Sequence, residues 1–275
     1  MAWAVYLNET SLASIGVYVM RLNSYTAAPT REYASLAIPG RQGVVLTADP
    51  TVAARTLEIQ CAISTSASTI AARAAAEDRV KALAYNALVR VVVDDDINAP
   101  RQIDAVCTAC QVTTRQHPVD AIVADVTLTM LCPDPTWYDV TGQLIGFGTT
   151  ARAIPLGTAP SGGIVRIAAP SWSADVVDPV LTYLNAAGVT LKTMSFTGTL
   201  TAGTDYLEVD LDRQTVVEYA SGTAANAISW LSTSSQFFAL DPMDGDVFST
   251  SYPQLKVTAT SGTPSATWAG ARRWL

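Results

Sequence analysis

The stretch AIVADVTLTMLCPDPTWYD, residues 121–139, decides the fold of the first half of this chain. Its first twelve residues alternate, and the apolar side chains of Val126, Leu128 and Met130 fall on one face. Asp125 falls on the other. A period of two over this length predicts a β-strand with one buried face and one face turned to water or to a partner.

The end of the same stretch is predicted to anchor the junction between two domains. The prolines of Cys-Pro-Asp-Pro stop the strand, because proline has no N–H for the ladder and restricts the residue before it. The aromatic residues that follow can fix the strand end against a neighbouring surface. The anchor residues are Pro133, Asp134, Pro135, Trp137 and Tyr138.

Residues 1–140, which include this strand, are predicted to form one barrel-like α+β domain with a single helix among its strands. The helix is predicted over residues 69–87, which are rich in alanine and can be capped by Ser66 or Ser68. Pro-Gly-Arg-Gln-Gly at 39–43 predicts a tight turn. Further strands are predicted at 3–8, 15–22, 55–64, 88–93, 101–115 and 121–132.

The second half has a different pattern. Residues 141–162 are rich in Gly, Thr and Pro and are predicted to be a linker. Residues 163–275 show short alternating segments separated by turn residues, which predicts a β-sandwich. The strands are expected at 163–168, 180–185, 189–196, 205–211, 215–220, 227–231, 236–240, 254–259 and 266–269. The fold class of the whole chain is therefore predicted to be mainly β.

Composition excludes some classes of function. The chain of 275 residues has a net charge of −7, which argues against binding nucleic acid by neutralising phosphates. No apolar run approaches the length that spans a bilayer, and the first residues lack the features of a signal peptide. We expect synthesis in a cytosol and no association with a membrane.

The cysteines and the histidine are not expected to carry chemistry. Cys107 and Cys110 have CxxC spacing, but no second close pair accompanies them, and His117 is the only histidine. We predict four reduced structural cysteines, which is usual in a reducing compartment.

Clusters of carboxylates are also read as solvated turns or outward strand faces. Asp94–Asp96 lacks the glycine and the ligand spacing of a calcium loop. Glu208, Asp210 and Asp212 alternate with apolar residues, as an outward strand face does. We predict no catalytic residue, no metal and no cofactor, and the chain is not expected to be an enzyme.

Several motifs in order resemble a known family. Pro39-Gly40-Arg41-x-Gly43, a single helix near 69–87 and the strand running into Asp134-Pro135-x-Trp137-Tyr138 resemble the distal tail protein family of long-tailed, siphovirus-type bacteriophages. Asp205-Tyr-Leu-Glu-Val-Asp210 and Phe238-x-Leu240-x-Pro242 are similar to the galectin-like carboxy-terminal sandwich of that family. The resemblance spans nearly the whole chain.

The resemblance implies a structural role in the virion, at the tail tip. Six copies of the first domain would form a ring that joins the tail tube protein to the tail hub protein, or baseplate. The sandwich domains would project outward as a docking platform. DNA and the tape-measure protein would pass through the lumen without specific binding.

Two hypotheses assign residues to this ring. The strand with Val126, Leu128 and Met130 is predicted to take part in ring formation. An acidic lumen would repel phosphate and let DNA slide, and the candidate lumen charges are Asp94, Asp95, Asp96 and Asp125.

An alternative function is a carbohydrate-binding, host-recognition module. A galectin-like sandwich invites it, and the candidate platforms for sugar stacking are Trp172, Trp230 and Trp268. A glycoside hydrolase is a third possibility that the sequence disfavours, because no pair of acids stands out.

Overall fold

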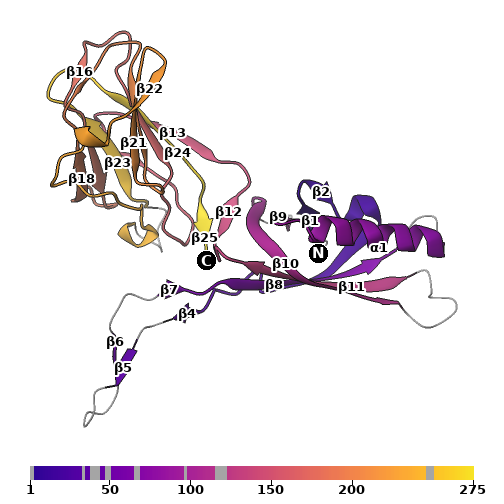
Figure 1. Ribbon diagram of the computed structural model, residues 1–275. Helices are drawn as coiled ribbons and strands as arrows, with labels where there is room; N and C mark the ends of the chain where they lie inside the picture. Colours follow the sequence, from indigo (N-terminus) through magenta and orange to yellow (C-terminus); the bar gives the residue numbers. More distant parts are fainter. Residues whose placement is uncertain are drawn as a thin grey trace. The chain divides into compact units, whose positions relative to one another are not determined.

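The protein is described from a computed structural model that covers residues 3–32, 35–37, 44–46, 51–64, 69–95, 98–114, 123–245 and 251–275. Contacts divide the chain into two units, Met1–Val140 with Leu275, and Thr141–Trp274. Figure 1 shows that strands dominate both units and that the helix α1 belongs to the first. None of the described helices is long and apolar enough to span a membrane.

The first unit is built on antiparallel strands in the order β2-β1-β9-β10-β11-β8-β3. The short helix η1 (Ala13–Ile15) links β2 to β3. β12 (Trp137–Asp139) pairs with the first residues of β10. The other strands are β1 (Ala4–Leu7), β2 (Thr10–Ser11), β3 (Val17–Asn23), β8 (Arg55–Ile63), β9 (Val89–Asp94), β10 (Arg101–Thr114) and β11 (Ala124–Cys132).

β10 gives the first unit its bent shape. Its first residues, from Arg101 to Ala105, pair with β9, and its later residues pair with β11. A β-bulge between Cys107 and Ala109 separates the two parts, and bulges bend the strand that contains them. One strand thus belongs to two sheets, which bend around a shared core, and the described strand order ends at β2 and at β3.

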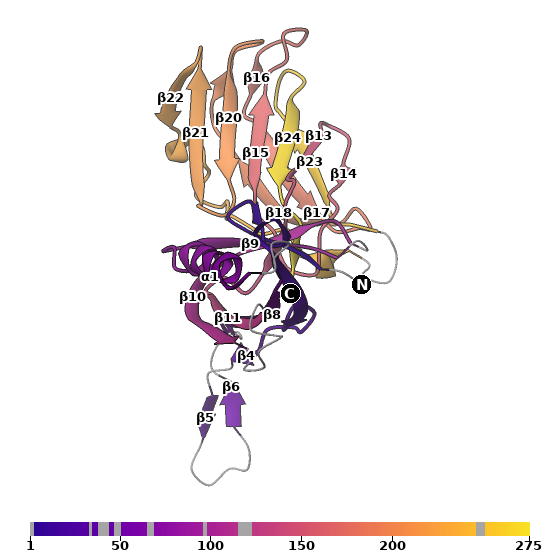
Figure 2. The same ribbon diagram turned by 90° about the vertical axis from the view of Figure 1, so that its right-hand side faces the viewer.

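Two small ladders lie in the chain between β3 and β8. β4 (Arg31–Glu32) pairs with β7 (Thr51–Val52). β5 (Ser35–Ala37) pairs with β6 (Val44–Leu46), as Figure 2 shows. The turn predicted at residues 39–43 and His117 both lie outside the described residues.

The helix α1 spans Ile70–Ala84. Thr69 is its N-cap, because the Thr69 hydroxyl accepts a hydrogen bond from the N–H of Ala72 at 3.1 Å. The predicted caps Ser66 and Ser68 lie outside the described residues. The helix ends before the predicted residue 87. Its last turn is closed by Asn86, whose side-chain amide donates to the carbonyl of Leu83 at 3.2 Å.

The second unit is a sandwich of two sheets, one of six strands and one of four among the described residues. The first has the order β13 (Gln143–Phe147), β24 (Ser265–Gly270), β15 (Ile164–Ala168), β20 (Tyr206–Asp210), β21 (Thr215–Ala220) and β22 (Thr223–Asn226). The second has the order β14 (Arg152–Ala153), β23 (Gln254–Thr258), β17 (Val180–Leu184) and β18 (Thr190–Ser195).

Shorter elements complete this unit. β16 (Val176–Val177) pairs with β19 (Thr199–Leu200), and Arg273 of β25 (Arg273–Trp274) is bridged to Ala159. Two short 3-10 helices, η2 (Ile228–Trp230) and η3 (Pro242–Asp244), lie in its loops.

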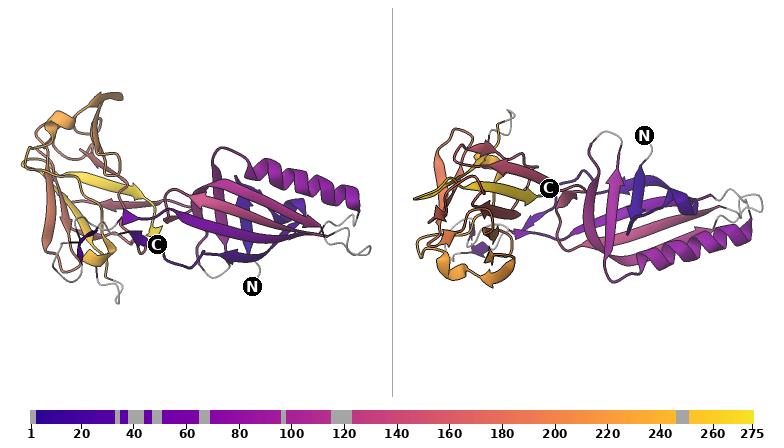
Figure 3. Two further views of the ribbon diagram at one scale, coloured as in Figure 1. Left: turned by 60° about the horizontal axis from the view of Figure 1, so that its bottom comes forward. Right: turned by 90° about the horizontal axis from the view of Figure 1, so that it is seen from above.

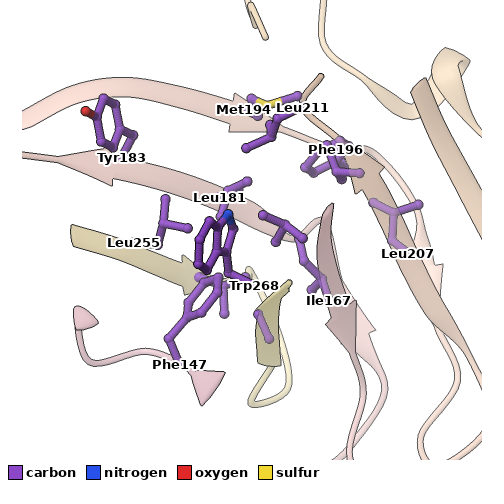
Figure 4. Close-up of a cluster of buried hydrophobic side chains, with 14 of the residues drawn as sticks. Phe147, Ile167, Leu181, Tyr183, Met194, Phe196, Leu207, Leu211, Leu255 and Trp268 are labelled. Atoms are coloured by element: carbon purple, nitrogen blue, oxygen red, sulfur yellow. The ribbon is translucent and has the colours of Figure 1, made fainter. Parts of the chain in front are cut away.

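The core of the sandwich lies between the two sheets. Figure 4 shows Trp268 from β24 among Phe147, Leu181 and Leu255. Trp268 is 0% exposed, and its indole N–H donates to the carbonyl of Gly162 at 2.8 Å. The N–H of a buried tryptophan usually finds such a partner, and this bond fixes the ring of Trp268 inside the core.

The fold class is confirmed: the chain is mainly β, with one α-helix among the described residues of the first unit and a sandwich in the second. The linker predicted at 141–162 is wrong, since β13 and β14 belong to the two sheets, and Phe147 and Ile154 lie in the core. Gly, Thr and Pro are common there because the strands are short and joined by turns. The strand predicted at 227–231 is replaced by the helix η2. In the part of the chain that the structure describes, residues 236–240 belong to no strand, and Leu240 is bridged to Ser161.

Candidate functional site

The apolar side of β11 faces the interior of the first unit. Val126, Leu128 and Met130 are at most 1% exposed. In Figures 1 and 3, α1 lies along one side of β8, β10 and β11, and the helix buries Ala76, Val80 and Ala84. These three residues of β11 were predicted to take part in ring contacts, and the structure corrects this. Their side chains pack in the core of the first unit, so a neighbouring subunit cannot contact them.

The opposite side of the same sheet carries polar residues. Cross-strand partners point to the same side of a sheet, and the pairing places polar side chains of four strands together. We call this set the polar face: Arg21, Asn23, Glu58, Gln60, Gln111, Thr113, Asp125, Thr127 and Thr129. Figure 1 shows α1, β1 and β9 on the other side of β8 and β11.

The polar face is weakly acidic. Glu58 and Asp125 carry its negative charges, and Arg21 is the cation among its described residues. The carboxylate of Glu58 accepts hydrogen bonds from the amides of Gln60 at 2.5 Å and Asn23 at 3.2 Å. These bonds order the side chains of two neighbouring strands. Such a surface of hydroxyls and amides offers few cations to a phosphate backbone.

The other candidate lumen charges lie in a different setting. Asp95 is 6% exposed and accepts hydrogen bonds from the backbone and side-chain N–H groups of Asn98 at 2.8 and 2.9 Å. Tyr25 also donates to it, at 3.4 Å. Burial, and then the charge of Asp95, raises the pKa of Tyr25. Asp95 is therefore an internal acceptor and not a lumen charge, Asp94 is half-buried at the end of β9, and Asp96 lies outside the described residues.

The predicted junction residues form a turn that is held inside the first unit. The carboxylate of Asp134 accepts hydrogen bonds from the N–H of Thr136 at 3.0 Å and from the hydroxyls of Thr136 and Tyr138. Trp137 is 1% exposed and its ring meets Tyr25 edge-on, with 5.0 Å between ring centroids. Pro135 is buried and Pro133 is exposed. Trp137 thus packs in the core of its own unit.

Arg55 is a residue whose setting the sequence did not reveal. It is 4% exposed, and its guanidinium has no hydrogen-bond partner among the described residues. Burial lowers the pKa of Arg55, and the electrostatic interaction with the neighbouring Cys132 partly offsets this effect. One signal was present: Arg55 is in phase with Leu57, Ile59 and Cys61 on the buried face of its strand.

The cysteines are free thiols, and three of them are buried. Burial raises the pKa of Cys61 to about 12 and that of Cys132 to about 11. A protonated thiol is neither a good nucleophile nor a good metal ligand. Among the described residues, no group of three or more His, Cys, Asp or Glu is placed to hold a metal ion.

The three tryptophans proposed for sugar stacking differ in how far their side chains are exposed. The prediction that Trp268 stacks on a sugar is wrong, because this residue lies in the core of the sandwich. Trp230 is partly buried against that core, where its ring leaves no room for a side chain at Gly198. Trp172 is 74% exposed.

The fold matches a known one over its full length. No protein-family model matches the sequence, and no curated protein matches it. The structure is similar to that of the phage SPP1 Dit (gp 19.1) protein, which is described as a paradigm of the hub adsorption apparatus in phages that infect Gram-positive bacteria. The TM-score is 0.74, the identity is 16%, and 100% of each chain is covered.

Two weaker matches are chains of the phage P2 baseplate in its activated conformation, with calcium and with strontium. They have TM-scores of 0.47 and 0.46 at 9% identity, and cover 98% and 97% of this chain and 98% of theirs. The match to the SPP1 protein confirms, at the level of the fold, the resemblance to distal tail proteins.

Proposed function

We propose that this chain is a structural, non-enzymatic protein of a phage tail tip, a distal tail protein that works in the virion. Six first units form a ring that joins the tail tube protein to the tail hub, and DNA and the tape-measure protein pass through its lumen. The observation that carries the proposal is the shared fold with the SPP1 Dit protein over 100% of both chains.

The polar face supports the proposal as a lumen surface. A lumen that passes DNA must offer little attraction to phosphate, since each neutralised phosphate strengthens binding. The polar face presents hydroxyls, amides and the carboxylates of Glu58 and Asp125. We therefore assign the lumen to this face. Its negative charges are those of Asp125, which the sequence predicted, and of Glu58.

The edge of the sheet supports lateral contact between copies. β3 ends the described strand order, and its residues Tyr18 and Met20 are 52% and 53% exposed. An edge strand presents backbone N–H and C=O groups that a second chain can pair with. A contact between this edge and a different surface of the next copy is heterologous, and such contacts form a ring when the rotation from copy to copy closes.

The mass of the purified protein in solution tests the ring. Light scattering after size exclusion is expected to give six times the chain mass of 29.0 kDa, and negative-stain images are expected to show six-fold rings with a central hole. A monomer at micromolar concentration, with no rings when the tail tube and hub proteins are added, contradicts the proposal.

A further inference from the structure

One end of the core of the first unit contains a positive charge that no described group neutralises. Arg55 is the first residue of β8 and points to the buried side of that strand, in phase with Leu57 and Ile59. It is 4% exposed, and none of its guanidinium nitrogens donates a hydrogen bond to a residue that the structure describes. Buried polar side chains are nearly always hydrogen-bonded, so the setting of Arg55 points to a partner from outside the chain.

The indole N–H of Trp137 is a second buried donor at this end of the core. Trp137 is 1% exposed, and its Nε1 also lacks an acceptor in the described ranges of the chain. Cys132 is the cross-strand partner of Arg55, and the turn of residues 133–136 leads from it directly to Trp137. Two buried donors without acceptors therefore lie at the same end of the first unit, and one of them carries a full charge.

The groups around Arg55 do not supply the missing negative charge. Burial raises the pKa of Cys132 to about 11, so its thiol is uncharged at neutral pH. The carboxylate of Asp134 accepts hydrogen bonds from Thr136 and Tyr138. Arg55 is paired with no carboxylate of the described residues.

This setting selects a small anion with one negative charge. A guanidinium offers N–H donors and no acceptor, and an uncompensated charge inside a protein is strongly destabilising. A water molecule accepts hydrogen bonds but leaves the charge uncompensated. A carboxylate on another chain needs a passage to the guanidinium, whose nitrogens are closed off from solvent. An inorganic ion that is taken up as the unit folds supplies the charge without such a passage.

We propose that the first unit binds a small monovalent inorganic anion, such as chloride, at the guanidinium of Arg55, with the indole N–H of Trp137 as a second donor. Hydrogen bonds from a charged donor to an anion are roughly twice as strong as those between neutral groups. The site exists only in the folded unit, so the ion stabilises the folded state by mass action. The site does not depend on the ring proposed above.

Hydrogen exchange of the full-length protein, measured by mass spectrometry, tests this linkage. Chloride is varied from about 10 mM to about 1 M, and gluconate, an anion too bulky for a closed site, keeps the ionic strength constant. Each tenfold rise in chloride above the dissociation constant is expected to increase the protection of β8 and β11 about tenfold. The strands β15 and β20 of the second unit are the internal control, and their protection is expected not to change.

Three variants separate the site from general effects of salt. Arg55→Met removes the charge, and the protection of its β8 and β11 is expected to be independent of chloride, whatever its basal stability. Trp137→Phe removes the second donor and is expected to move the onset of the chloride effect to higher concentration. Arg79→Met removes an exposed cation from α1 of the same unit and is expected to keep the wild-type response.

Crystals grown in bromide locate the ion directly, because bromide scatters anomalously. A peak in contact with the guanidinium of Arg55 is expected. The proposal is overturned by a water molecule or an acceptor from a neighbouring chain in that place, by no chloride response in the wild type, or by an unchanged response in Arg55→Met. If Arg55→Met does not fold, the bromide crystals decide. Light scattering on the same samples reports the ring separately.

Discussion

Leu128 and Thr127 are neighbours in β11 and point to opposite sides of the sheet, which makes them a matched pair for mutation. Leu128 is 0% exposed, so the carboxylate of Leu128→Asp would be buried without a partner. We expect it to cost more than about 4 kcal/mol and to unfold the first unit. Thr127→Asp places the same group on the polar face and is expected to cost about 0.5 kcal/mol or less.

Urea denaturation followed by circular dichroism measures both changes. Equal losses of stability in the two variants would mean that the two sides of β11 are equally buried, contrary to the structure.

Asp205 gives the second unit a dependence on pH. Burial raises its pKa, but hydrogen bonds from Thr201, Thr204 and Ser221 lower it by more, so the pKa falls below the ordinary value of 3.8. A lowered pKa stabilises the fold above the ordinary value, and this stabilisation is lost as the pH falls through the folded-state pKa.

Asp205→Asn is therefore expected to cost about 1–3 kcal/mol at pH 7, because part of this hydrogen bonding is lost. The difference from the wild type should shrink as the pH is lowered below 3.8. Urea titrations at pH 7 and at pH 3 measure it, with the exposed Asp78→Asn as the control. A difference that grows on acidification would contradict the assignment.

Secondary-structure elements were predictable where one periodic pattern decided them. The alternation of residues 124–132 and 55–63 gave the strands β11 and β8, since a strand with one buried face leaves this signal in sequence. The same alternation could not tell whether the apolar side met its own helix or another subunit. Residues 143–147 alternate only weakly, so the sequence analysis assigned β13 to a linker. The burial of Trp268 depends on a hydrogen bond to the carbonyl of Gly162, which lies more than a hundred residues earlier in the chain.

The start of α1 offers a test at the scale of one element. Thr69→Ala removes the acceptor for the N–H of Ala72 and is expected to cost about 1 kcal/mol. Thr69→Ser keeps the hydroxyl and is expected to retain most of the stability. The thermal midpoint of the first unit measures both, and an unchanged midpoint in Thr69→Ala would assign the cap elsewhere.

The role of β13 and β14 can be tested by two fragments. A fragment of residues 141–275 contains Phe147 and Ile154, whereas one of residues 163–275 lacks them. Each of these buried side chains is worth several kcal/mol, of the order of 3–5 for a Phe-to-Ala change. We expect the longer fragment to unfold cooperatively and the shorter one to be unfolded or aggregated. Cooperative melting of the shorter fragment would restore the linker assignment.

At the scale of the whole molecule, the polar face can be tested by reversing its charge. The triple variant Glu58→Lys, Asp125→Lys and Thr129→Lys keeps the buried side of the sheet intact. If the polar face lines the lumen, the assembled variant should bind short linear duplex DNA, and binding should weaken steeply with salt. The wild-type ring should not bind.

Fluorescence anisotropy measures this binding, and light scattering confirms that the variant still assembles. A ring of normal mass that gains no affinity for DNA would place the polar face away from the lumen.

The continuity of β10 through both sheets of the first unit also has a mechanical consequence. In antiparallel pairs the hydrogen bonds run perpendicular to the strands. A pull along β10 is therefore met by the bonds to β9 and β11 in shear, many at once, and not one after another. The backbone of this strand therefore transmits tension from one sheet to the other, and resists their separation.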